Sequence, residues 1–156
     1  MAHRFLVSAC LAGHSCAYDG RARPHPLVER LVGEGRAVPV CPEALGGLPT
    51  PRPPAEIQGG DGHEVFAGRA RVVDLEGRDV TDAFLEGART ALAIARRHGL
   101  TAAILKARSP SCGYGLIYDG TFAGRLRPGH GVTAALLLHH GFPVFTESEA
   151  ERAVTS

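Results

Sequence analysis

Four short apolar segments recur along the sequence, and helical or glycine-rich stretches separate them. They cover Phe5–Ala9, Ala37–Val40, Ala102–Leu105 and Phe142–Phe145. Apolar runs of this length are typical of strands that are buried on both faces of a parallel sheet. The alternation of strands and helices predicts an α/β fold: a single three-layer domain with a mostly parallel sheet, spanning residues 1–156.

The connecting helices are predicted over residues 26–33, 82–98 and 131–140, where apolar side chains recur at helical spacing. Thr81 is in position to cap the second of these helices, and Gly99 is a natural end for it.

Three other segments depart from the regular alternation of strands and helices. Proline cannot donate to a strand ladder, so Pro39 predicts an edge or strand-end position for the second strand. Residues 42–63 contain five prolines and five glycines and predict a long loop of functional importance. Residues 64–80 predict a small hairpin, with Arg71–Asp74 as one arm and the turn near Glu76.

Composition limits the class of protein. The chain has 156 residues, 44% hydrophobic and 21% charged, which is typical of a globular domain. A net charge of +1 offers no basic excess for general nucleic-acid binding. No run approaches the roughly 18 to 20 apolar residues of a membrane span, and the first apolar run is too short for a signal peptide. We therefore expect a cytoplasmic protein.

Cysteines follow three of the predicted strands. Cys10, Cys41 and Cys112 each lie at or after a carboxyl end, and such ends share one edge of a parallel sheet, where ligands bind. Three convergent thiolates can hold zinc or an iron–sulfur cluster. Structural zinc sites use close pairs such as C-x2-C, which this sequence lacks, so a cluster is favoured. The alternative is that each cysteine is a small buried hydrophobic residue.

Residues beside these cysteines are candidates for catalysis. Glu43 follows Cys41 in a Cys-Pro-Glu turn, where a carboxylate could relay protons; alternatively it is an exposed surface glutamate. Ser109 and Ser111 precede Cys112 and could bond cluster sulfurs or substrate or donate a proton; alternatively they only form a turn.

Other residues nearby are candidates for substrate binding. Lys106 and Arg108 could bind an anionic group or simply be solvated. Gly113 lies in a glycine-rich loop that could let backbone amides approach a ligand. The fingerprints of nucleoside-triphosphate and dinucleotide binding are absent from the sequence.

Longer motifs carry a family resemblance over nearly the whole chain. They are Ser8–Gly13 with Cys16 and Tyr18–Gly20, Val40–Glu43, Gly46–Arg52, Ala55–Ile57, Asp79–Thr81, Ser109–Gly113, Ile117–Phe122 and Gly131–Leu136. Together they resemble the DUF523 family, also called the TudS or thiouracil desulfidase family. One departure is Ala17, at a position that is usually basic in the family.

The resemblance implies a Rossmann-like domain with an oxygen-sensitive 4Fe-4S cluster held by three cysteines, which leaves one iron open. It implies non-redox desulfuration of a thiolated nucleobase, nucleoside or nucleotide of the 2-thiouracil type, with C=S replaced by C=O and sulfide released. It also implies proton-handling roles for Glu43 and Ser109.

Which three of the four cysteines bind the cluster is left open by the resemblance. The strand-end argument selects Cys10, Cys41 and Cys112 as ligands and leaves Cys16 to line the substrate pocket. Because the sequence holds one domain-sized unit, we expect a small substrate rather than intact tRNA, and a monomer or small homo-oligomer. Two other hypotheses are a non-enzymatic zinc-binding or sulfur-handling protein and a cysteine hydrolase. A cysteine hydrolase needs a histidine base beside its thiol, and His14 is the one histidine that lies near a cysteine in the sequence.

Overall fold

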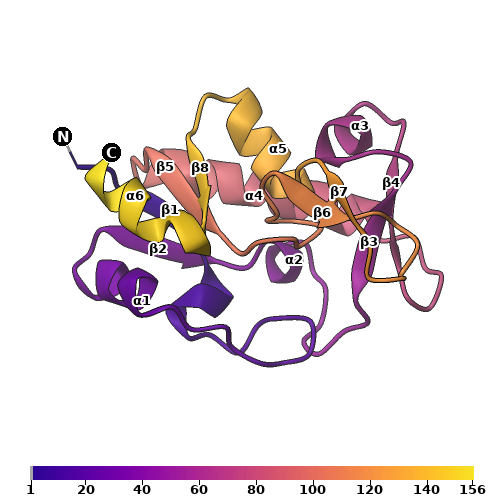
Figure 1. Ribbon diagram of the computed structural model, residues 1–156, viewed down its shortest axis with the longest axis horizontal. Helices are drawn as coiled ribbons and strands as arrows, with labels where there is room; N and C mark the ends of the chain where they lie inside the picture. Colours follow the sequence, from indigo (N-terminus) through magenta and orange to yellow (C-terminus); the bar gives the residue numbers. More distant parts are fainter. Residues whose placement is uncertain (1) are drawn as a thin grey trace.

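A four-stranded parallel sheet forms the centre of the computed structural model, which describes residues 2–156 (Figure 1). The strands lie in the order β2 (Ala37–Val40), β1 (Phe5–Ser8), β5 (Ala102–Leu105) and β8 (Val144–Thr146), and each neighbouring pair is parallel. The predicted α/β class with a mostly parallel sheet is confirmed.

Helices cover both faces of this sheet and complete three layers. On one face Phe5 and its neighbours pack against α1 (Pro26–Gly33) and α6 (Ala150–Thr155). On the other face Leu6 packs with buried residues of α4 (Thr81–Arg97) and α5 (Val132–His139). These residues are Ala91, Leu92, Ala95, Ala134 and Leu137. Successive side chains of a strand point to opposite faces, so β1 serves both cores and is buried throughout.

The strand β2 tolerates a proline because of its place in the sheet. Pro39 lies opposite Val7 of β1, and β2 is an edge strand with this one neighbour in the sheet. The missing N–H therefore costs little. The edge position predicted from Pro39 is confirmed.

The prediction of one long loop over residues 42–63 is wrong, because three regular elements interrupt this stretch. It contains α2 (Pro42–Leu45), β3 (Ala55–Gln58) and the start of α3 (Gly62–Phe66), with irregular segments between α2 and β3 and between β3 and α3. Short elements separated by prolines and glycines carry too few residues to show their own periodicity.

The hairpin predicted over residues 64–80 forms in part, because Val73 bridges Asp79 in antiparallel fashion and the Val80 N–H donates to the Val72 carbonyl at 2.9 Å. Residues 64–66 belong to α3, and β4 (Arg71–Asp74) pairs antiparallel with β3 from the stretch predicted as a loop. The turn near Glu76 does form, since the Gly77 N–H donates to the Asp74 carbonyl at 2.9 Å. Only the second partner of β4, strand β3, lies upstream across α3, and local patterning could not identify that pairing.

Thr81 does not cap α4, which corrects the predicted role. Val80 occupies the cap position, and the Thr81 hydroxyl accepts a hydrogen bond from the Val72 N–H at 2.9 Å, which ties the helix to β4. Gly99, at φ 64°, lies just beyond the end of the helix as predicted.

Smaller elements complete the chain. They are the 3-10 turns η1 (Ala9–Ala12) and η2 (Glu147–Glu149) and an antiparallel hairpin of β6 (Leu116–Tyr118) and β7 (Leu126–Pro128), which the sequence did not predict. Among residues 2–156, no helix has the length and apolar character that crossing a bilayer requires.

Candidate functional site

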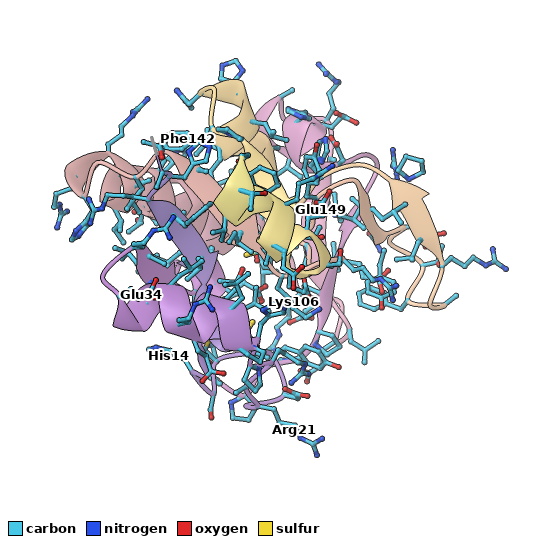
Figure 2. The ribbon with its side chains drawn as sticks, turned by 60° about the vertical axis from the view of Figure 1, so that its left-hand side comes forward. His14, Arg21, Glu34, Lys106, Phe142 and Glu149 are labelled. Atoms are coloured by element: carbon cyan, nitrogen blue, oxygen red, sulfur yellow. The ribbon has the colours of Figure 1, made fainter. Side chains whose placement is uncertain are left out.

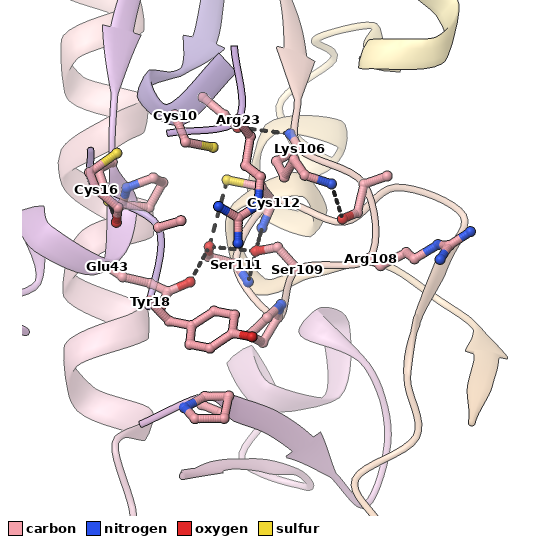
Figure 3. Close-up of a pocket in the computed structure, with 18 of the residues that line it drawn as sticks. Cys10, Cys16, Tyr18, Arg23, Glu43, Lys106, Arg108, Ser109, Ser111 and Cys112 are labelled. Carbon is pink, nitrogen blue, oxygen red and sulfur yellow. Dashed lines mark hydrogen bonds between the residues drawn. The ribbon is translucent and has the colours of Figure 1, made fainter. Parts of the chain in front are cut away.

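All four cysteines line one cavity of about 720 Å³ beside the carboxyl ends of β1, β2 and β5. Cys10 lies in η1 directly after β1, Cys41 follows β2, and Cys112 lies in the loop after β5. Figure 3 shows the sulfur atoms of Cys10 and Cys112 close to each other, with Cys16 on the neighbouring wall. The parallel sheet therefore gathers thiols that are distant in sequence, as the strand-end argument predicted.

Cys10 is held by a tight backbone turn. The chain leaves the buried strand β1 and turns at once through η1, which ends at Gly13 with φ 94°. The Cys10 carbonyl accepts hydrogen bonds from the N–H groups of Gly13 at 3.3 Å and Arg23 at 2.8 Å. These bonds fold the following loop back over the site and leave Cys10 only 8% exposed.

Cys41 and Glu43 are positioned by a direct backbone contact between α2 and α4. Cys41 is the N-cap residue of α2, and Pro42 at the first helical position favours the start of the helix. A Cβ atom placed on Gly87 of α4 would lie 1.9 Å from the Pro42 carbonyl oxygen, and one on Gly46 would lie 1.9 Å from a carbonyl of α4. Two glycines therefore allow the close approach that fixes this turn.

Cys112 lies in a loop that α5 and a serine side chain hold in place. The N–H groups of Val132 and Thr133 each donate to carbonyls of this loop at 2.8 Å, which satisfies the first turn of α5. The Ser109 hydroxyl accepts hydrogen bonds from the N–H groups of Ser111 at 3.1 Å and Cys112 at 3.0 Å. Ser109 thus has the turn-forming role that was one of the two interpretations of this residue.

Burial and a hydrogen bond between two of the cysteines shift the pKa values of the thiols. Burial raises the pKa of Cys10 to about 11 and that of Cys112 to about 12, although the Ser8 and Ser111 hydroxyls oppose the shift at Cys112. A hydrogen bond from Cys16 lowers the pKa of Cys41, and the same bond raises the pKa of Cys16. Metal ligands must be thiolates, so a cation in this cavity has to compensate the burial of their charge.

The donor set bears on the kind of metal centre. Within residues 2–156, no three His, Cys, Asp or Glu side chains are grouped so as to hold a single metal ion. A zinc ion needs donors about 2.0–2.3 Å from one point, whereas the thiolates of a cubane cluster bind different iron atoms. Soft sulfur donors around one cavity are therefore the donor type that an iron–sulfur cluster uses.

A chain of hydrogen bonds joins the candidate catalytic residues (Figure 3). The Ser111 hydroxyl donates to Glu43 Oε2 at 3.0 Å and lies 3.0 Å from the Ser109 hydroxyl oxygen. It also lies 3.6 Å from the sulfur of Cys112. The Glu43 side chain is only 13% exposed, so its interpretation as an exposed surface glutamate is wrong.

The candidate anion-binding side chains differ in their surroundings. Lys106 lines the cavity, but its Nζ forms an ion pair with Glu147 Oε2 at 2.9 Å. In Figure 2 Lys106 is labelled near the centre of the view, while Arg21 extends outward from the loop that follows Cys16. Arg108 lines the rim at φ 69° and points away from the cysteines in Figure 3.

Gly113 does not lie on the cavity wall that the described residues form. Its N–H donates to the Ser109 carbonyl at 2.8 Å, and an added Cβ would approach the same oxygen to 2.7 Å. The amide that was predicted to face a ligand is therefore bonded within the loop, and glycine is needed there for packing.

Three cavity residues were not singled out from the sequence. The Ser8 hydroxyl accepts a hydrogen bond from the Lys106 N–H at 2.8 Å. Tyr18 is 46% exposed on the cavity wall, and the buried Arg52 forms an ion pair with Glu43 at 2.9 Å. Each is part of a motif that carried the family resemblance, but only the fold places it beside the thiols.

Comparisons with known proteins agree with this geometry. The sequence model of a family described as 2-thiouracil desulfurase matches residues 5–149. A Bacillus subtilis (strain 168) protein called uncharacterized protein YbbK is 50% identical over 144 residues, which cover 92% of this chain and 95% of the relative.

A solved structure is similar over nearly its full length. It is described as the [4Fe-4S]-dependent thiouracil desulfidase TudS (DUF523Vcz), is 43% identical, and superposes with a TM-score of 0.87 over 98% of this chain and 96% of the other. The resemblance found in the sequence is thereby confirmed, and the chain belongs to the 2-thiouracil desulfurase family.

Proposed function

We propose that this protein is a [4Fe-4S]-dependent desulfidase that converts the C=S group of a 2-thiouracil-type substrate to C=O and releases sulfide. The observation that carries the proposal is a single cavity lined both by thiols suited to a cluster and by a buried Glu43–Ser111 pair. Membership of the 2-thiouracil desulfurase family supports it.

Cys10, Cys41 and Cys112 would hold the cluster. Cys10 and Cys112 are buried, and Cys41 starts a helix whose position is fixed by backbone contact. Cys16 lies on a half-buried loop and would remain free to line the substrate pocket. When bound through three protein ligands, the cluster supplies an iron with an open position, a Lewis acid suited to a soft sulfur atom.

Glu43 and the two serines would handle protons. The overall change is hydrolytic: water adds at the thiocarbonyl carbon, the C–S bond breaks, and hydrosulfide and the C=O product form without net electron transfer. The Glu43 carboxylate would accept the proton of the attacking water. Ser111 bonds Glu43 directly and contacts Ser109, so the two hydroxyls form a path that could return a proton to a ring nitrogen.

The cavity sets the class of substrate. A volume of about 720 Å³ is in the range of small-molecule sites and accommodates a base, a nucleoside or a nucleotide. Lys106 would bind an anionic group of the substrate if that group replaced Glu147 as its ion-pair partner. Cys16 and the exposed Tyr18 would contact the ring of the substrate. We place this one-domain protein in the cytoplasm, as a monomer or small homo-oligomer.

Metal analysis with a direct assay tests the proposal. The chain is reconstituted anaerobically, and iron, zinc and acid-labile sulfide are measured before 2-thiouracil is added. We expect about four irons per chain and equal amounts of uracil and hydrosulfide. About one zinc per chain without conversion would instead support the zinc-binding or sulfur-handling alternative.

Alanine variants of the cysteines test the ligand set. Cys10→Ala, Cys41→Ala and Cys112→Ala should each lose iron, whereas Cys16→Ala should keep a full complement. Full iron content in any of the first three, together with iron loss in Cys16→Ala, would contradict the assignment. A cysteine hydrolase that uses Cys112 would stay active in Cys41→Ala, so the same set tests that hypothesis.

Glu43→Gln tests the proton-handling role. The amide keeps the size of the side chain but cannot accept the proton, and we expect kcat to fall about 10²–10⁴-fold with iron content unchanged. Unchanged kcat would remove Glu43 from the mechanism.

A further inference from the structure

Arg52 has a buried guanidinium whose three nitrogens all have partners. Its Nε donates to Glu43 Oε1 at 2.9 Å. Its Nη1 donates to the Pro49 carbonyl at 3.1 Å and the Thr50 hydroxyl at 2.8 Å, and its Nη2 donates to the Cys16 carbonyl at 2.9 Å. The side chain is only 5% exposed. These contacts hold the guanidinium in one orientation.

This orientation determines where the Glu43 carboxylate lies. Arg52 binds Oε1 and the Ser111 hydroxyl binds Oε2, so the carboxylate is held from both sides. Hydrogen bonds between charged groups are stronger and more directional than neutral ones. Without the guanidinium, a buried carboxylate would lose its charge partner and be free to turn away from Ser111.

Arg52 also joins two walls of the cavity. Its backbone N–H donates to the Tyr18 carbonyl at 2.7 Å, and its Nη2 lies 4.0 Å from the sulfur of Cys41. One residue therefore connects the loop that carries Cys16 to the turn that carries Glu43. The ammonium of lysine cannot reproduce this planar fork of donors.

We propose that Arg52 is the positioning residue for Glu43: it acts on the reaction through the Glu43 carboxylate and does not contact the substrate. This inference rests on the proposed desulfidase function, in which Glu43 accepts a proton. It predicts that loss of Arg52 slows turnover but leaves the metal centre and substrate binding nearly unchanged.

Kinetics and metal content of Arg52→Gln, Arg52→Lys, Glu43→Gln and the Arg52→Gln/Glu43→Gln double variant test this inference. All are studied as reconstituted holoenzymes with 2-thiouracil. We expect unchanged iron and sulfide content and, in Arg52→Gln, a KM within about twofold of wild type with kcat reduced about 10²-fold, the usual effect of a misplaced catalytic group. Arg52→Lys should recover only part of kcat.

The double variant separates positioning from an independent role. If Arg52 acts only through Glu43, the double variant should be no slower than Glu43→Gln alone. Arg78→Gln is the matched control, since the exposed Arg78 pairs with Asp74 and neither residue lines the cavity, so its loss should leave both kinetic constants unchanged.

Several outcomes would overturn the inference. They are wild-type kcat in Arg52→Gln, loss of iron from that variant, or a double variant slowed by the product of the two single effects. An inactive wild-type holoenzyme would refute the proposed function instead. Positioning also has a readout without turnover: in a crystal structure of Arg52→Gln the Glu43–Ser111 hydrogen bond should be broken, and its retention would refute the inference.

Discussion

Replacing Gly87 by alanine should move the turn that carries Cys41 and Glu43, although Gly87 itself does not line the cavity. Gly87 lies in the middle of α4, and a Cβ atom there would meet the carbonyl oxygen of Pro42 at 1.9 Å. Ordinary contact begins near 3.4 Å, so α2 and α4 must separate by roughly 1.5 Å. A backbone carbonyl cannot rotate away as a side chain can.

The magnitude follows from two opposing effects. Alanine in place of glycine inside a helix stabilises it by about 1 kcal/mol, whereas overpacking of this kind costs up to about 3 kcal/mol. We expect a net loss of about 2 kcal/mol, which lowers Tm by roughly 2–4 °C per kcal/mol in a chain of this size. A displacement of about 1 Å at the site should reduce kcat about 10²-fold.

Thermal unfolding of the apo-protein and turnover of the holoenzyme measure the two effects separately. Gly33→Ala is the matched control, because Gly33 ends α1 with nothing within 4 Å of an added Cβ. The control should change stability by less than about 1 kcal/mol and leave kcat unchanged. A Gly87→Ala variant as stable and as active as Gly33→Ala would show that the contact between α2 and α4 does not position the site.

Two further substitutions test hydrogen bonds that hold the structure. Ser8→Ala removes a buried hydroxyl that accepts the Lys106 N–H, and it should cost about 1–3 kcal/mol in urea unfolding of the apo-protein, while wild-type stability would show that water replaces the hydroxyl. Asp61 accepts hydrogen bonds from the N–H groups of His63 and His130 at 3.0 Å; burial by itself would raise its pKa, but these bonds hold the pKa below the ordinary 3.8. Because the folded-state pKa is the lower one, the carboxylate stabilises the fold above pH 3.8 and this contribution is lost as pH falls below it. Asp61→Asn should therefore cost about 1–3 kcal/mol at pH 7 and progressively less below pH 4, and a difference independent of pH would contradict this reasoning.

Local sequence patterns were sufficient for the central sheet and its main helices. Strand β5 is buried at every position and is apolar at every position, so its pattern needed no knowledge of the fold. The position of Pro39 in an edge strand could likewise be predicted, because a missing N–H excludes a central place whatever the neighbours are. The placement of cysteines after strands then predicted their meeting, since parallel strands end at one edge.

Local sequence patterns could not predict contacts between segments that are distant in the sequence. The pairing of β3 with β4 joins two four-residue strands across α3, and neither strand has enough residues to indicate a partner. The predicted capping role of Thr81 failed for the same reason, because its hydroxyl bonds a strand earlier in the chain.

The sequence by itself determined the class of fold, the family and the set of thiols, because each depends on residue types and on order along the chain. Only the tertiary structure decided how these residues act together. Arg52 meets Glu43, and Glu43 meets Ser111, because α2, the loop after it and the loop after β5 close around one cavity. Such contacts depend on how separate elements pack, which no local pattern encodes.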